Sequence, residues 1–206
     1  MKCTTSNSIY AFLFTISPKA RASGVHQCDP RQEEQPHERA FFRFLEQLAI
    51  QVAIAPTFLA TLVNDILADL QPLLQKNKAS VKLALSPTLP LVLVDPIQLR
   101  RVYENLITNA LKHNPPGIII TLTAEAQADS IYCTVQDNGM GIRPNQRSRL
   151  FDLYYRGSES HDRTGIGLGL YLGRQIITAH GSEIGVKAGD SQGAAFWFRL
   201  PLANPA

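Results

Sequence analysis

The sequence predicts an α+β fold: a two-layer α/β sandwich in which helices cover one face of a mixed sheet. Apolar residues recur at helical spacing over residues 58–76, 95–113 and 168–180, and short strand-like runs lie between these segments. Most of the strand-like runs are joined by short turns, which favours hairpins. Helices that alternate with hairpin-linked strands are typical of a sheet that buries one face against helices.

Composition limits the function classes. The 206 residues are 45% hydrophobic, which suits one globular domain with additional sequence, and the net charge of +3 predicts no nucleic-acid partner. No apolar run is long enough to span a membrane, so we expect a cytoplasmic chain. Cys3, Cys28 and Cys133 have no paired spacing, which argues against a disulfide framework and against a zinc site.

The N-terminal part divides into two segments. Residues 1–40 are rich in polar residues and proline and are expected to form a disordered leader, with a secretory signal at the apolar run 9–16 as the alternative. Residues 41–56 are expected to form an amphipathic helix, because apolar residues recur on one face until a proline ends the run. Residues 57–202 then form the principal predicted domain.

This domain begins with a helix over residues 58–76, in which Pro72 should cause a kink or a local break. Apolar and β-branched runs then predict strands, with a turn at 86–90 between the first two and a closing hairpin at the end. The predicted strands are 81–85, 91–94, 118–124, 130–136, 184–188 and 194–200.

The helix over residues 95–113 has clear signals at both ends. Asp95 suits the N-cap, Pro96 suits the first helical position, and Gln98 can close a capping box. The following Asn114-Pro115-Pro116-Gly117 ends the helix.

A polar stripe on this helix carries the first candidate site. Asn105, Asn109 and Lys112 recur at i, i+4 and i+7, so they share one face. An amide oxygen is a hard, neutral ligand for Mg²⁺, which takes much of its shell from water and phosphates, and a lysine can offset phosphate charge. The alternative is an ordinary solvated polar face.

Two glycine-containing segments complete the pattern. Asp137 ends a strand-like run and precedes Gly139 and Gly141, so its carboxylate could accept a hydrogen bond from an adenine amino group, or the segment could be an ordinary turn. Gly165, Gly167 and Gly169 precede the helix over residues 168–180, and free amides at a helix N-terminus bind phosphate. Their spacing fits neither a dinucleotide fingerprint nor a Walker loop. The preceding polar residues are interpreted as a mobile lid, with a plain surface loop as the alternative.

These three motifs, in this order, resemble the N, G1 and G2 boxes of the sensor histidine kinase catalytic domain, a member of the gyrase, Hsp90, histidine kinase and MutL ATPase superfamily. Residues 150–157 resemble the F box between G1 and G2, and residues 193–201 resemble the closing strand. The similarity covers residues 57–202 and implies a Bergerat-type ATP-binding fold.

The resemblance implies ATP and Mg²⁺ as cofactors. Asn109 would ligate Mg²⁺, Lys112 would lie near the phosphates, and Asp137 would bind the adenine amino group. Asn105 stands where gyrase-like ATPases carry a glutamate base, which disfavours activation of water and favours transfer to a histidine. Glu104, one position away, should point elsewhere. The other implied ATP-binding residues are Gly139, Gly141, Gly165, Gly167, Leu168 and Gly169.

The implied function is transfer of the γ-phosphoryl group to a histidine on a partner domain or chain, which would then pass it to a response regulator. No phosphoacceptor histidine is identified, because none of the five histidines is followed by an acidic residue and an Arg-Thr-Pro-like run. These histidines are His26, His37, His113, His161 and His180. Residues 41–56 are interpreted either as a remnant of the dimerisation hairpin or as an isolated helix. The alternatives are a non-catalytic nucleotide-binding module and an anti-sigma-type serine/threonine kinase, against which Asn105 argues.

Overall fold

A computed structural model describes residues 50–86, 88–155, 167–189 and 192–203. These residues belong to one compact unit, Ala49–Ala206. Its elements alternate as the sequence predicts. They are β1 (Ala55–Thr57), α3 (Leu59–Lys76), β2 (Ser80–Leu85), β3 (Val92–Val94), α4 (Pro96–His113), β4 (Ile119–Ala126), β5 (Ser130–Asp137), α5 (Pro144–Arg147), α6 (Gly169–Ala179), β6 (Ile184–Ala188) and β7 (Ala194–Pro201).

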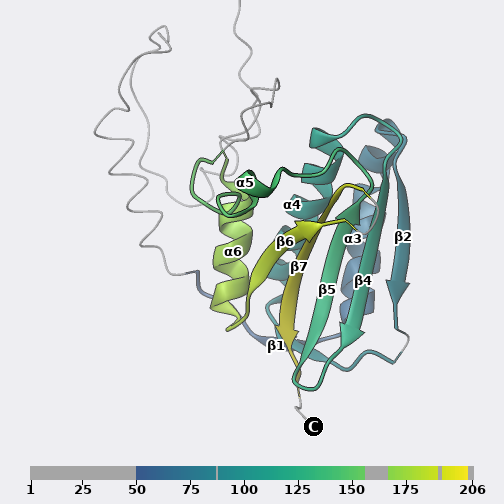
Figure 1. Ribbon diagram of the computed structural model, residues 1–206. Coiled ribbons are helices and arrows are strands. Elements are labelled where there is room, and N and C mark those ends of the chain that lie inside the picture. Colours follow the sequence, from purple (N-terminus) through teal and green to yellow (C-terminus); the bar gives the residue numbers. More distant parts are fainter. Residues whose placement is uncertain (1–49, 87, 156–166, 190–191, 204–206) are drawn as a thin grey trace, which may run out of the picture. The chain divides into compact units, whose positions relative to one another are not determined.

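The main sheet has five strands in the order β2-β4-β5-β7-β6. β2 runs parallel to β4, and the other neighbours are antiparallel, so the sheet is mixed. Figure 1 shows α3, α4 and α6 together on one face of this sheet. The predicted two-layer sandwich is therefore confirmed. In the described part of the chain, no helix combines the length and the apolar character that crossing a membrane requires.

The core lies between the two layers. Alternate residues of β5 and β7 face the helices, and paired positions such as Cys133 and Phe198 are both fully buried. From α4, Tyr103 packs edge-on against Phe198 with ring centroids 5.2 Å apart. The opposite sheet face carries Tyr132 stacked on Trp197. α4 is thus held against the centre of the sheet, and the polar stripe on this helix has a rigid support.

The predicted helix at 41–56 is wrong over residues 50–56, and its earlier residues lie outside the described ranges, as does the predicted leader. Residues 50–54 have no regular structure, and Ala55–Thr57 forms β1, which pairs antiparallel with β3. The backbone N–H of Ala53 donates to Asp95 Oδ2 at 2.8 Å. Tertiary hydrogen bonds therefore replace helical ones just before Pro56, which has no N–H to donate.

Two further expectations need correction. The strands on either side of the turn at 86–90 do not pair with each other, because β2 pairs with β4 and β3 pairs with β1. The predicted break at Pro72 is also absent, since α3 continues through it to Lys76. Pro72 and Ala68 are both exposed, so water can satisfy the carbonyl that loses its helical donor.

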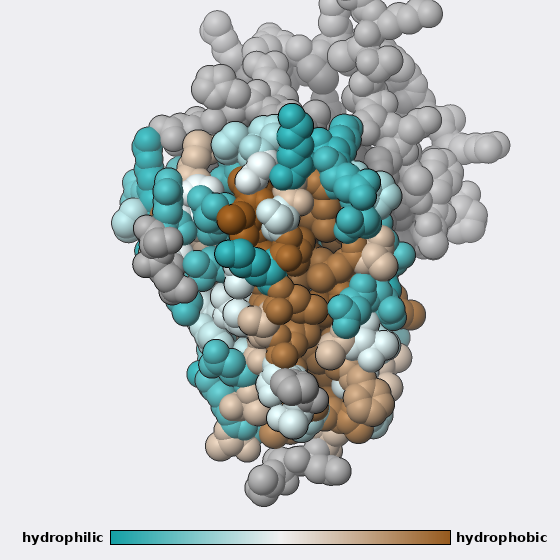
Figure 2. All heavy atoms as spheres, turned by 90° about the vertical axis from the view of Figure 1, so that its right-hand side faces the viewer, coloured by the Kyte–Doolittle hydropathy of each residue, from teal (hydrophilic) through white to brown (hydrophobic). Residues whose placement is uncertain are grey.

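β2 is one of the two edge strands of the main sheet, and β6 is the other. Figure 2 shows apolar side chains gathered in a band on the β2 side of the molecule, between polar flanks. Leu83 on β2 is 39% exposed, and α3 and β2 contribute further partly buried apolar residues on the same core. These residues are Leu67, Leu70, Leu73, Val81 and Leu85. The band is the border of the core where the two layers meet.

Candidate functional site

The start of α4 is fixed by Asp95, as predicted for an N-cap. Asp95 Oδ1 accepts hydrogen bonds from the backbone N–H of Ile97 at 2.9 Å and of Gln98 at 3.1 Å. The predicted capping box is wrong, because the backbone N–H of Asp95 donates to His180 Nε2 at 2.8 Å. The Gln98 side chain instead accepts from Arg101.

His180 ties the end of α6 to the start of α4. Because Nε2 accepts a hydrogen bond from Asp95, Nδ1 carries the ring proton and donates to the Ile176 carbonyl at 2.7 Å. The buried His180 side chain therefore joins the C-terminal end of α6 to the N-terminal end of α4 through two hydrogen bonds to backbone groups. Burial alone would raise the pKa of Asp95, but hydrogen bonds from the backbone N–H groups of Ala53, Gln98 and Ile97 hold this pKa below its usual value.

The polar stripe of α4 faces α6 at Asn105. A Cβ on Gly169 would overlap the Asn105 side chain, and Gly173 lies one turn further along the same contact. Asn105 Nδ2 is buried and, among the described residues, has no hydrogen-bond partner. Unpaired buried donors are rare in proteins, so this amide is available to a ligand at the start of α6. Glu104 points elsewhere, as expected, and lies 3.5 Å from Arg100.

The N-cap residue of α6 provides no side-chain cap. Leu168 occupies the N-cap position and offers no side-chain hydrogen bond, and the first turn contains no acidic residue. The first backbone N–H groups of a helix have no partner within it, and the helix dipole makes this end positive. Leu168 and Gly169 thus lie where an anion can be held, next to the Asn105 amide.

The end of β5 supplies a buried carboxylate. Asp137 is 6% exposed, and its Oδ1 accepts a hydrogen bond from the Gly139 N–H at 2.9 Å. None of the described residues donates a hydrogen bond to Oδ2. Gly193 lies against this residue with φ +86°, and a Cβ there would overlap the Asp137 carbonyl oxygen. Gly141, with φ +76°, in turn packs on the Gly193 carbonyl.

Asn114, at the C-terminal end of α4, holds the loop after Asp137. Its Nδ2 donates to the Ala110 carbonyl at 2.9 Å, and its Oδ1 accepts from the Met140 N–H at 2.9 Å. Gly139 packs so closely on this side chain that a Cβ would overlap it. The second glycine segment is therefore attached to the end of the helix that carries the polar stripe.

α4 thus brings the three predicted motifs together. Asn105 contacts the start of α6, and Asn114 contacts the loop after Asp137. These positions are separated by about 13 Å along the helix, from its rise of about 1.5 Å per residue. Asn109 is half-buried between them, and Lys112 is exposed one turn further on. Gly165 lies outside the described residues.

The segment before residue 156 packs onto the sheet. Phe151 is 7% exposed and meets Phe196 of β7 edge-on, with centroids 6.4 Å apart. Tyr154 and Gly167 both have left-handed backbones, with φ +61° and +73°. A Cβ on Gly167 would lie 2.9 Å from the Tyr154 carbonyl carbon, so the chain before residue 156 and the chain after 166 meet at this point.

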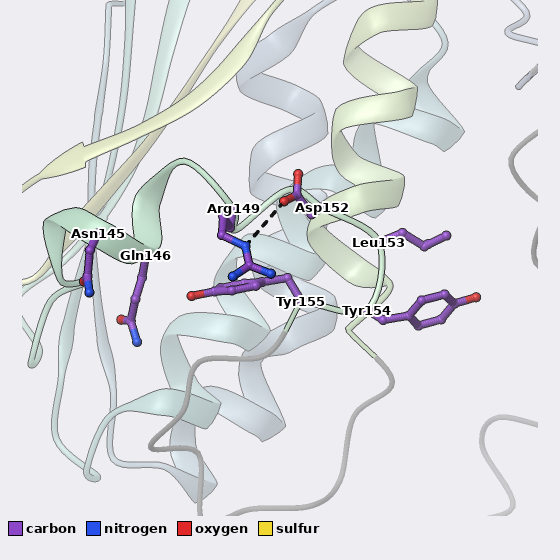
Figure 3. A pocket seen from close by; sticks show the side chains of 7 residues that line it. All are labelled: Asn145, Gln146, Arg149, Asp152, Leu153, Tyr154 and Tyr155. Carbon is purple, nitrogen blue, oxygen red and sulfur yellow. Dashed lines mark ion pairs between the residues drawn. The ribbon is translucent and has the colours of Figure 1, made fainter. Parts of the chain in front are cut away.

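A cleft of about 540 Å³ lies beside this segment. Figure 3 shows the Arg149 guanidinium over the Tyr155 ring, with Asp152 beside it and Tyr154 pointing away. None of the predicted nucleotide-binding residues that the structure describes lines this cleft. The residues that line it are Asn145, Gln146, Arg149, Asp152, Leu153, Tyr154 and Tyr155. Contacts along α4, and not this cleft, therefore define the candidate site.

Sequence reasoning missed two residues of the site. From the sequence alone, Asn114 indicates only a helix end and Gly193 only the start of a strand. An asparagine before a proline at a helix end is a recognisable signal for a cap. Asn114 Oδ1 accepts from the Met140 N–H, 26 residues further along the chain, and no local pattern in the sequence indicates this bond.

Mg²⁺ fits the chemistry of the candidate site. In the described part of the chain, no cluster of three or more histidine, cysteine or acidic side chains could hold a metal by itself. A single amide such as Asn109 suits an ion that takes its remaining ligands from phosphate and water.

Comparisons with known proteins agree with this architecture. Residues 94–204 match a family model described as "Histidine kinase-, DNA gyrase B-, and HSP90-like ATPase". The alginate biosynthesis sensor protein KinB of Pseudomonas aeruginosa is 38% identical over 128 residues, which cover 62% of this chain and 21% of KinB. The adaptive-response sensory kinase SasA of Synechococcus sp. (strain JA-3-3Ab) is 32% identical over 154 residues, which cover 74% of this chain and 41% of SasA. This chain thus spans less than half the length of these relatives.

Solved structures show the same fold. The crystal structure of full-length ShkA in complex with AMPPNP matches with a TM-score of 0.68 and 28% identity, covering 82% of this chain and 36% of that one. The nucleotide-free catalytic domain of histidine kinase ThkA matches with a TM-score of 0.64 and 20% identity, covering 74% of this chain and 97% of that one. The second match, at its low identity, concerns the fold alone.

Proposed function

Because this chain belongs to the family of histidine kinase-, DNA gyrase B- and HSP90-like ATPases, we propose that it is the ATP-binding catalytic module of a two-component sensor histidine kinase. The module binds Mg-ATP and presents the γ-phosphoryl group to a histidine on a partner domain or chain. That partner then passes the phosphoryl group to a response regulator. The observation that carries the proposal is that α4 contacts both the loop after Asp137 and the start of α6 at Gly169. Among the described residues, nothing donates a hydrogen bond to Asp137 Oδ2, and the N-cap residue of α6 provides no side-chain cap.

In this proposal each residue has a role that follows from its position. Asp137 Oδ2, which has no donor among the described residues, accepts a hydrogen bond from the adenine amino group. The first amides of α6 and the Asn105 amide donate to phosphate oxygens. Asn109 is the protein ligand of Mg²⁺, and Lys112 offsets phosphate charge. Mg²⁺, when bound, supplies charge neutralisation for the developing transition state.

The reaction type follows from the side chain at position 105. An amide cannot take a proton from water, so Asn105 is a poor base for hydrolysis. A neutral imidazole is already a nucleophile. Its nitrogen forms a bond to the γ-phosphorus while the bond between that phosphorus and the β–γ bridging oxygen breaks, and ADP leaves with the electron pair. Positioning and electrostatics do most of the work in such transfers.

Titration calorimetry with ATP, in the presence and absence of Mg²⁺, tests the binding step. The wild-type chain should bind more tightly with Mg²⁺. Asn109→Ala should lose about 10- to 100-fold in Mg-ATP affinity, from about 1.5–3 kcal/mol for a charge-assisted contact, and should bind metal-free ATP unchanged. Asn64→Ala, at an exposed position on α3, is the matched control. A folded sample without Mg-dependent binding, or Asn109→Ala with unchanged Mg-ATP affinity, contradicts the assignment.

The transfer step needs a histidine-bearing helical hairpin supplied as a separate chain, with γ-labelled ATP. An acid-labile phosphoprotein is expected, because phosphohistidine hydrolyses in acid. An acid-stable product would instead indicate serine or threonine phosphorylation. Tight Mg-ATP binding with no transfer to any such hairpin would favour a non-catalytic nucleotide-binding module.

A further inference from the structure

Two consecutive backbone N–H groups in the loop after β5 are bonded by side chains from two different elements. The Gly139 N–H donates to Asp137 Oδ1, at the end of β5. The Met140 N–H donates to Asn114 Oδ1, at the end of α4. Gly139 is clamped between the two, since its α-carbon packs directly on the Asn114 amide.

We propose that Asn114 is a positioning residue that sets the orientation of the Asp137 carboxylate and thereby the preference of the site for adenine over guanine. This role rests on the proposed function. Asn114 does not need to touch the base. It holds the backbone that supplies the only hydrogen bond found, among the described residues, on the Asp137 carboxylate. With Oδ1 fixed in this way, Oδ2 keeps the direction in which it can accept from an exocyclic amino group.

Base preference follows from this direction. Adenine presents an amino donor where guanine presents a carbonyl oxygen. A fixed carboxylate accepts a hydrogen bond from the adenine amino group. Facing guanine, the same carboxylate has no donor and is repelled by the carbonyl oxygen. A buried polar group without a partner is strongly unfavourable, so discrimination requires that the carboxylate cannot rotate towards another donor. Loosening Gly139 and Met140 removes that constraint.

α3 provides a matched control for the helix-capping part of the Asn114 interaction. Asn77 is the C-cap residue of α3, and its Nδ2 donates to the Leu73 carbonyl at 2.8 Å, just as Asn114 Nδ2 donates to Ala110 at 2.9 Å. Both asparagines are half-buried. Only Asn114 also accepts a hydrogen bond from the loop that follows Asp137. Asn77→Ala therefore removes a cap without releasing that loop.

The test is calorimetric measurement of the dissociation constants for Mg-ATP and Mg-GTP on the full chain. Asn114→Ala should weaken Mg-ATP binding by about fivefold or more, the equivalent of one lost hydrogen bond, while Mg-GTP binding changes less than about twofold. Asn77→Ala should leave the ratio of the two constants within about twofold of wild type, although both variants lower the melting temperature. In a double-mutant cycle, Asn114→Ala should have almost no effect on the ratio once Asp137→Asn is present, because the two residues act as one unit.

The outcomes distinguish failure of the proposed function from failure of the positioning role of Asn114. A wild-type chain that binds no Mg-ATP overturns the proposed function, and the positioning role with it. A wild-type chain that prefers ATP, with Asn114→Ala and Asn77→Ala shifting the ratio equally, overturns only the positioning role and leaves Asn114 as a cap. Equal wild-type affinity for Mg-ATP and Mg-GTP also overturns the positioning role. So does a double mutant in which the effects of Asn114→Ala and Asp137→Asn on the affinity ratio simply add.

Discussion

Asp95 connects three parts of the chain, so its truncation should weaken the whole domain. Its Oδ1 caps α4 through Ile97 and Gln98, and its Oδ2 accepts from Ala53 in the segment that leads into β1. Asp95 is 5% exposed, and water cannot readily replace these bonds. Asp95→Ala leaves the backbone bond to His180 in place, because that bond uses the Asp95 N–H.

The expected loss can be worked out from these contacts. Replacing an N-cap aspartate by alanine costs about 1 kcal/mol. The 2.8 Å bond from Ala53 to the charged carboxylate contributes about 2 kcal/mol more, at the middle of the range for charge-assisted hydrogen bonds. The free energy of unfolding should therefore fall by about 3 kcal/mol. For a unit of this size the melting temperature should fall by roughly 6–12 °C.

Urea unfolding followed by fluorescence measures this change directly, because Trp197 is the single tryptophan of the chain and lies on β7. Asp152→Ala is the control. Its carboxylate is 52% exposed and lies 3.9 Å from Arg149, so the change should stay within about 0.5 kcal/mol. If Asp95→Ala also stays within that limit, the three hydrogen bonds do not carry the stability assigned to them.

The pH dependence has a definite sign. The pKa of Asp95 is lowered in the folded chain, so its carboxylate stabilises the fold above the unfolded pKa of about 3.9, and this contribution is lost as pH falls through the lower, folded pKa. The stability difference between wild type and Asp95→Ala should be constant from about pH 5 to 8 and should shrink below about pH 4. A difference that grows in acid would refute the reasoning.

Two further substitutions probe packing around α4. Gly169→Ala should destabilise the fold by about 1–3 kcal/mol, because the added Cβ would overlap the Asn105 side chain. Asn105→Ala in the same chain should restore most of this loss. An unchanged urea midpoint for Gly169→Ala would contradict the contact. Tyr103→Phe should keep or raise stability by up to about 1 kcal/mol, because the buried hydroxyl has no hydrogen-bond partner among the described residues. Burial raises the pKa of Tyr103 well above its usual value and raises the pKa of the adjacent Cys133 to about 12, so neither group carries charge in the core. A loss of more than about 1 kcal/mol in Tyr103→Phe would instead show that the Cys133 thiol is a hydrogen-bond partner.

Local signals in the sequence were sufficient for most elements. Helical spacing predicts α3, α4 and α6 to within a few residues, and apolar and β-branched runs predict β2 to β7. Asp95 is a correct N-cap prediction because the bonds it makes to Ile97 and Gln98 lie within the same turn of chain. Such features depend only on neighbours in sequence, so a single sequence contains them.

Contacts between distant segments were decided only by the tertiary structure. The Asp95 N–H, which a capping box would bond to the Gln98 side chain, donates instead to His180 Nε2, 85 residues away. β2 finds a parallel partner in β4 and not in the nearer β3. The predicted helix before Pro56 gives way to a hydrogen bond with Asp95, which lies 42 residues after Ala53.

The candidate site shows the same division. The sequence alone identifies Asn105, Asn109, Lys112, Asp137 and the glycines as residue types that suit a nucleotide. It does not show that Asn114 holds the loop after Asp137, or that Gly193 packs against Asp137. The identity of a ligand group is a local property of the chain. Its direction depends on which backbone atoms pack against it, and those atoms arrive from other elements only when the two layers close on each other.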